Sequence, residues 1–184
     1  MPERGASVVL SGVRQELGSA AFLDANFVID AFIDSASLHG AARDLLIELA
    51  AHARQGRIRL CLSTRVIDEV LWASRIVLVR RDHGQAAWAG MGADERADAW
   101  LRYSEEIAYL GRLLLAPDAP WEVLSVTAED AGLAIEAIER HGLQPADAFH
   151  YAVCRRACDS CIVTNDRHFR GLSELNCIRY DTGQ

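Results

Sequence analysis

Short apolar runs alternate with longer stretches of helical periodicity along the whole chain, and this alternation most constrains the fold. Strands are expected over residues 20–23, 58–62, 121–126, 161–163 and 176–180, and helices over residues 26–33, 40–53, 64–71, 94–115, 127–141 and from about 146. That order predicts a parallel sheet covered by helices on both faces. A glycine-rich loop is expected over residues 82–93 and an edge strand around residues 8–10. A chain of 184 residues is expected to form one domain.

Charge and cysteine content limit the classes of function. All 19 basic residues are arginines and the formal net charge is −7, so bulk binding of nucleic acid is not expected. The absence of lysine excludes chemistry that requires one, such as a Schiff base or a phosphate-loop lysine. Five cysteines without an export signal, and no apolar run of about 18 residues, predict a cytoplasmic protein with no membrane segment.

Four carboxylates stand where a predicted strand meets a helix or turn. They are Asp24, Glu69, Asp147 and Asp166. The carboxyl ends of parallel strands share one edge of a sheet, so these side chains are expected to converge there. Carboxylates without a basic partner repel one another unless a hard divalent cation neutralises them, and Mg²⁺ or Mn²⁺ suits oxygen ligands. The pattern predicts a metal-dependent phosphodiesterase.

Each carboxylate also has an ordinary structural interpretation. Asp24 is suited to cap the helix that follows it, Asp147 to the first turn of a helix, and Asp166 to a turn. Glu69 stands four residues after Arg65, at the spacing of a surface ion pair. The ordered occurrence of all four favours a site, although the sequence leaves open whether Asp68 or Glu69 faces inward.

Four segments around these carboxylates resemble the motifs of the PIN domain family, which includes the VapC-type toxin ribonucleases. They read LDANFVID (residues 23–30), STRVIDEV (63–70), LQPADAFHYA (143–152) and IVTNDRHF (162–169). The resemblance implies a PIN-like three-layer α/β/α fold with a central, mostly parallel sheet. It implies a single domain over residues 1–184, in which residues 1–19 form a lead-in and residues from about 80 to 120 a helical insertion or extension.

The resemblance also implies an activity, a cofactor and partners. The expected activity is a Mg²⁺- or Mn²⁺-dependent endoribonuclease that hydrolyses RNA, as the toxin of a type II toxin–antitoxin pair. An antitoxin protein and a second copy of the chain are the expected partners, with apolar residues between Trp88 and Trp100 as a candidate dimer interface. The alternative is a non-catalytic PIN-like module that binds RNA or protein.

Roles for individual residues follow from the same resemblance. Asp24 and Asp147 are expected to bind the metal directly, whereas Glu69 and Asp166 hold its waters or a second ion. Two residues have expected supporting roles: Asn26 orients Asp24, and Thr164 positions the attacking water or a phosphate oxygen. Arg65 and Arg167 are expected to bind substrate. His150 and His168 are interpreted as packed or exposed residues that the chemistry does not need.

The spacing of three cysteines gives one further alternative. Cys154, Cys158 and Cys161 are spaced as in the cluster-binding motif of radical SAM enzymes. Free cysteine is among the most buried residue types, and the first two residues are expected on one face of a helix. We therefore interpret all three as core residues rather than as ligands.

Overall fold

The computed structural model describes residues 18–180, and within them five strands form one parallel sheet. The strands are β1 (Ala20–Leu23), β2 (Arg59–Ser63), β3 (Trp121–Leu124), β4 (Cys161–Val163) and β5 (Asn176–Ile178), in the order β3-β2-β1-β4-β5. The edge strand expected around residues 8–10 lies outside the described residues. The chain builds outward from β1 in one direction and then reverses, so the topological switch point lies between β1 and β4, where parallel α/β sheets bind ligands.

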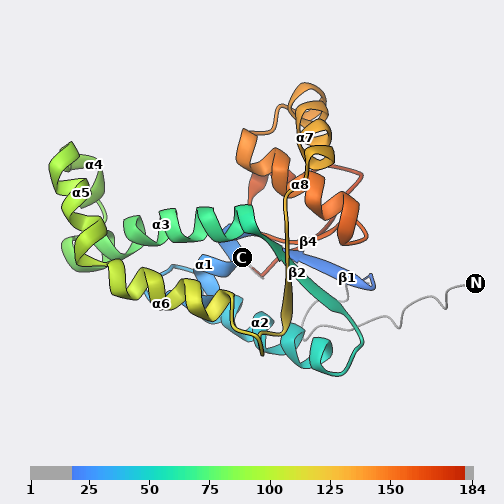
Figure 1. Ribbon diagram of the computed structural model, residues 1–184, viewed down its shortest axis with the longest axis horizontal. Coiled ribbons are helices and arrows are strands. Elements are labelled where there is room, and N and C mark those ends of the chain that lie inside the picture. Colours follow the sequence, from blue (N-terminus) through green and yellow to red (C-terminus); the bar gives the residue numbers. More distant parts are fainter. Residues whose placement is uncertain (1–17, 181–184) are drawn as a thin grey trace, which may run out of the picture.

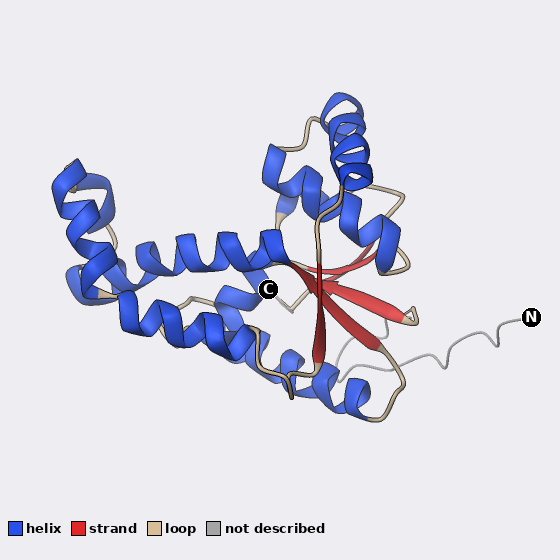
Figure 2. Cartoon of the chain, viewed as in Figure 1, coloured by secondary structure: helices blue, strands red, loops and turns tan. Residues whose placement is uncertain are grey.

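Helices cover both faces of this sheet. They are α1 (Ala25–Phe32), α2 (His39–Arg54), α3 (Thr64–His83), α4 (Ala87–Gly90), α5 (Ala93–Arg102), α6 (Ser104–Leu114), α7 (Ala128–His141) and α8 (Pro145–Ala157), with a short 3₁₀ turn η1 (Arg167–Phe169). Helices α7 and α8 lie on one face, and α1, α2 and α6 lie on the other (Figures 1 and 2). The predicted three-layer α/β/α fold is confirmed. None of these helices combines the length and apolar character needed to cross a membrane.

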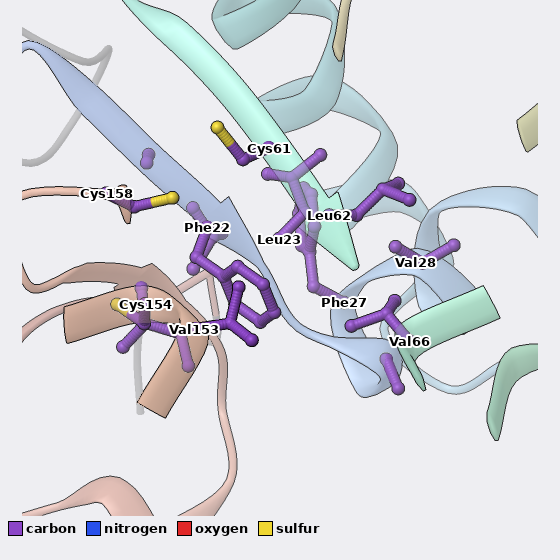
Figure 3. Close-up of a cluster of buried hydrophobic side chains, with 14 of the residues drawn as sticks. Phe22, Leu23, Phe27, Val28, Cys61, Leu62, Val66, Val153, Cys154 and Cys158 are labelled. Atoms are coloured by element: carbon purple, nitrogen blue, oxygen red, sulfur yellow. The ribbon is translucent and has the colours of Figure 1, made fainter. Parts of the chain in front are cut away.

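The sheet is buried on both faces, which explains its composition. All four residues of β1 are buried. A parallel strand covered on both sides has no face toward solvent, so its sequence need not alternate between apolar and polar residues. Phe22 on β1 packs among side chains of α8, and Phe27 of α1 lies near Leu62 on the other side (Figure 3). Packing on both faces holds the strands in place, and with them the residues at their carboxyl ends that form the candidate site.

The cysteines belong to the core, as interpreted from the sequence. Cys61, Cys154, Cys158 and Cys161 are buried free thiols. The Cys154 thiol donates a hydrogen bond to the backbone carbonyl of Cys161 at 3.3 Å. One detail differs, because α8 ends at Ala157 and Cys158 is its C-cap rather than part of its face.

The helical arm, residues 75–107, differs most from expectation. Helix α3 continues to His83 and the short helix α4 follows, where a loop was predicted over residues 82–93. The single helix predicted over residues 94–115 is two helices, because the chain breaks at Tyr103. Tyr103 is buried in a small separate core with Leu78 and Ile107, and its hydroxyl donates a hydrogen bond to Asp82. The arm thus folds back on α3 and projects from the sheet (Figure 1).

Candidate active site

Asp24 lies at the centre of the carboxyl edge, immediately after β1. Its backbone N–H donates to the carbonyl of Val163 on β4, and its side chain is almost fully buried. Oδ2 accepts a hydrogen bond from the Thr164 hydroxyl at 2.7 Å, and Oδ1 lies 2.9 Å from Nδ1 of His150. Asp24 occupies the N-cap position of α1, but its side chain makes no capping hydrogen bond, so capping does not account for this carboxylate.

His150 joins Asp24 to Glu69. The imidazole is 1% exposed, and its Nε2 lies 3.5 Å from Oε2 of Glu69. Its position one turn after Asp147 on α8 is the sequence signal for it, because residues three apart share a helix face. His150 was interpreted from the sequence as a packed or exposed residue, because nothing local to its motif shows that the imidazole contacts Asp24.

Asp147 and Asp166 meet at a second histidine. Nδ1 of His168 lies 3.0 Å from Oδ2 of Asp147 and 3.2 Å from Oδ1 of Asp166. The backbone N–H of His168 also donates to Oδ1 of Asp166 at 2.8 Å, which caps η1. The turn expected at Asp166 therefore exists. Asp166 caps this turn and also places its carboxylate beside Asp147 and His168.

The two supporting residues act differently from expectation. The Asn26 amide donates to Oδ2 of Asp166 at 3.2 Å, not to Asp24, because α1 turns residue 26 toward the β4 end. The Thr164 hydroxyl donates to Asp24 and accepts from the Asp166 backbone N–H, and its side chain is buried. The Thr164 hydroxyl thus holds the orientation of the Asp24 carboxylate. The role expected for Thr164 toward an attacking water or a phosphate oxygen stays a prediction.

Helix α3 separates Asp68 from Glu69. Asp68 is exposed and pairs with Arg65 one turn earlier, whereas Glu69 is half-buried and turned toward His150. The ion pair considered for Arg65 and Glu69 is thus made by Asp68. Arg65 and Arg167 are the two arginines expected to bind substrate. Arg65 lies near enough to Glu69 for its charge to oppose, in part, the rise in the pKa of that residue, and Arg167 is exposed on η1.

The cluster carries an electrostatic cost. Burial raises the pKa of Glu69, and the charges of Asp24 and Asp147 raise it further. Burial likewise raises the pKa of Asp147, with added repulsion from Asp166 and Asp24. Burial opposes protonation of His150, but its hydrogen bond to Asp24 and the surrounding carboxylates outweigh this and raise its pKa. Positive charge is therefore favoured at this edge of the sheet.

Unsatisfied polar atoms fit a cation with its waters. Oε2 of Glu69, Nε2 of His150 and Nδ1 of His168 are buried, and none has a hydrogen-bond partner. Each such atom is costly unless a water or an ion completes it. Carboxylate oxygens with imidazole nitrogens form a donor set for Mg²⁺ or a first-row transition ion. The residues that could hold the ion are Asp24, Glu69, Asp147, Asp166 and His168.

Comparisons with known proteins place this geometry in a family. The family model described as PIN domain matches residues 21–175. VapBC2 from Rickettsia felis, solved bound to a DNA fragment from the promoter, is 15% identical with a TM-score of 0.55, over 88% of this chain and 99% of that one. VapC20 from Mycobacterium tuberculosis, a sarcin-ricin loop cleaving toxin, is 18% identical with a TM-score of 0.48, over 77% of this chain and 86% of that one. No curated protein matches the chain.

Proposed function

Because this chain belongs to the PIN domain family, we propose that it is a metal-dependent endoribonuclease that hydrolyses RNA phosphodiester bonds. The observation that carries the proposal is the convergence of Asp24, Glu69, Asp147 and Asp166 at the switch point between β1 and β4. These residues are far apart in sequence, and ordinary capping or pairing does not account for their meeting.

The roles follow from the contacts. Mg²⁺ or Mn²⁺, when bound, lowers the pKa of its water and stabilises charge on the phosphoryl oxygens. Asp24, Asp147 and Asp166 would hold the ion, and Thr164 and His150 fix the rotamer of Asp24 from opposite oxygens. The Oε2 atom of Glu69 lies beside His150, while the side chain as a whole keeps 28% of its surface exposed. Glu69 is therefore placed to accept a proton from an attacking water.

We extend the proposal to the toxin of a type II toxin–antitoxin pair acting in the cytoplasm. The resemblance of all four motifs to VapC-type ribonucleases supports this extension, and the fold shared with VapBC2 is consistent with it. Arg65 and Arg167 flank the carboxylate edge and are proposed to contact RNA phosphates, for which a guanidinium is suited. Co-purification with the product of an adjacent small reading frame tests the pairing.

Cleavage of end-labelled RNAs by the full chain with Mn²⁺ or Mg²⁺ tests the activity. EDTA and Asp147→Asn should each abolish cleavage, whereas Asp118→Asn should retain it. Asp118 is an exposed residue in the loop before β3, at the opposite edge of the sheet. No cleavage across a panel of RNAs, together with no calorimetric metal binding, would contradict the proposal and favour the non-catalytic module.

A further inference from the structure

We propose that His168 is a nitrogen ligand of this cation site and that it shifts the preference of the site from Mg²⁺ toward Mn²⁺ and Co²⁺. The inference rests on the proposed function, because Asp147 and Asp166 belong to the proposed active site. It adds an imidazole to a site that sequence analysis described with carboxylates alone.

The first observation is the position of one ring nitrogen. Nδ1 of His168, Oδ2 of Asp147 and Oδ1 of Asp166 lie within 4.8 Å of one another, and among residues 18–180 no other three such side chains gather as closely. Nδ1 is close to both carboxylates, yet its alignment makes a hydrogen bond with neither. A nitrogen placed between two carboxylates without donating to them has the arrangement of a third ligand.

The second observation is a buried polar side chain on the other side of the cluster. His150 is 1% exposed, and its Nε2 lies 3.5 Å from Glu69 Oε2, with no hydrogen-bond partner for either atom. The charge of Asp147 also acts on His150, so the two halves of the cluster share one electrostatic environment. Unsatisfied atoms on both sides of the carboxylates therefore point to an ion with its waters between them.

The backbone holds His168 in place. Its N–H is fixed by Asp166, and the next residue, Phe169, is buried in the core and anchors η1. The His168 side chain is 36% exposed, which leaves one side of the ring open for water exchange. The capped turn and the anchored neighbour together fix the backbone position from which the His168 ring reaches Asp147.

The chemistry of the donors gives the predicted selectivity. Mg²⁺ is hard, binds oxygen ligands and retains several waters. Imidazole nitrogen is a better donor to first-row transition ions, and affinity rises from Mn²⁺ to Co²⁺ at a given site of mixed donors. A nitrogen beside two carboxylates should therefore strengthen Mn²⁺ and Co²⁺ binding much more than Mg²⁺ binding.

The test compares His168→Gln with a matched control, His83→Gln, in the full chain. His83 is exposed on the helical arm and lies outside the carboxylate cluster. Mn²⁺ affinity is measured from the electron paramagnetic resonance signal of free Mn²⁺, and Mg²⁺ affinity by competition. We expect His168→Gln to weaken Mn²⁺ binding by at least about 10-fold, because loss of even an outer-shell partner costs about 10- to 100-fold. Mg²⁺ affinity should change much less, and His83→Gln should change neither.

Electron spin echo modulation from ¹⁴N in the Mn²⁺ complex identifies the ligand directly. The wild-type complex should show imidazole modulation, and His168→Gln should lose it while His150→Gln retains it. Mn²⁺ binding without ¹⁴N modulation, or loss of modulation only in His150→Gln, would overturn the inference and leave the proposed function intact. A wild-type chain that neither binds these ions nor cleaves RNA would overturn both. If His168→Gln does not fold, His168→Asn takes its place in both measurements.

Discussion

Removing the carboxylate of Asp130 should destabilise the layer that carries half of the active site. Asp130 is fully buried in the first turn of α7 and accepts hydrogen bonds from Arg156 of α8 at 2.6 and 3.0 Å. It also accepts from the N–H and hydroxyl of Thr127, whose hydroxyl in turn accepts from the Asp130 N–H. One carboxylate thus caps α7 and ties it to α8, the helix that supplies Asp147 and His150.

The magnitude follows from these contacts. Thr127 remains the N-cap, and loss of the capping-box hydrogen bond that Asp130 accepts from its N–H costs about 1 kcal/mol. Hydrogen bonds to charged groups contribute about 1.5–3 kcal/mol each, but the Arg156 side chain is 28% exposed and regains water, so we count the pair as about 2 kcal/mol. Asp130→Ala should therefore lower the free energy of unfolding by about 3 kcal/mol, or the melting temperature by roughly 6–12 °C at this chain length.

The effect should depend on pH in one direction. Burial by itself raises the pKa of Asp130, but the hydrogen bonds from Arg156 and Thr127 outweigh it and hold the pKa below its usual range. A carboxyl group whose pKa is lower in the folded state stabilises that state at pH values above its unfolded pKa of about 3.9. This stabilisation is lost as the pH falls through the folded pKa. The deficit of Asp130→Ala should be constant from neutral pH to about pH 5 and shrink in stronger acid.

Urea unfolding followed by circular dichroism measures this deficit. Glu129→Ala is the matched control, because Glu129 is exposed in the same turn and should change stability by no more than about 0.5 kcal/mol. Asp130→Asn keeps a capping oxygen and should lose about 2 kcal/mol, the charged part alone. An Asp130→Ala deficit below about 1 kcal/mol, or one that persists unchanged in acid, would refute the reasoning.

Three further predictions concern other parts of the molecule. Ser63→Ala removes the oxygen that accepts from the Val66 N–H at the start of α3, and it should lower stability by about 1 kcal/mol in thermal melts; no change would contradict the cap. Metal at about 100 times its dissociation constant should stabilise the wild type by about 2.7 kcal/mol, and Asp24→Asn should lose this shift in scanning fluorimetry. The candidate dimer interface runs from Trp88 to Trp100, and Trp100 is 38% exposed. Replacing Trp88 and Trp100 with serine should convert a dimer to a monomer in light scattering, and a dimer that survives would exclude this interface.

Sequence patterns predicted the sheet because each strand carries its own local signal. The all-apolar β1 follows directly from residue type. The helical arm was less predictable, because its break at Tyr103 depends on a tertiary contact. The Tyr103 hydroxyl bonds to Asp82, twenty-one residues earlier, and no periodicity within residues 94–115 reports that contact.

The candidate site divides in the same way. The prediction that these carboxylates stand at strand ends is correct for Asp24 and Asp166, which follow β1 and β4. It is wrong for Glu69, which lies inside α3, and for Asp147, which lies in the first turn of α8 after another helix. The motifs did not predict what each side chain contacts. Asn26 is two residues from Asp24 but bonds to Asp166, and His150 is 126 residues from Asp24 but lies against it. Pairing of β1 with β4 creates these contacts, and such pairing is a property of the folded sheet.

The histidines explain how a chain of net charge −7 keeps four carboxylates at one edge. His150 lies between Asp24 and Glu69, and His168 lies between Asp147 and Asp166, so each carboxylate has one imidazole neighbour. An imidazole contributes positive charge when protonated and a ligand atom when neutral. His150, whose pKa the surrounding carboxylates raise, offsets part of their repulsion. The contacts of the two histidines with the four carboxylates are the geometry on which the proposed cation site rests.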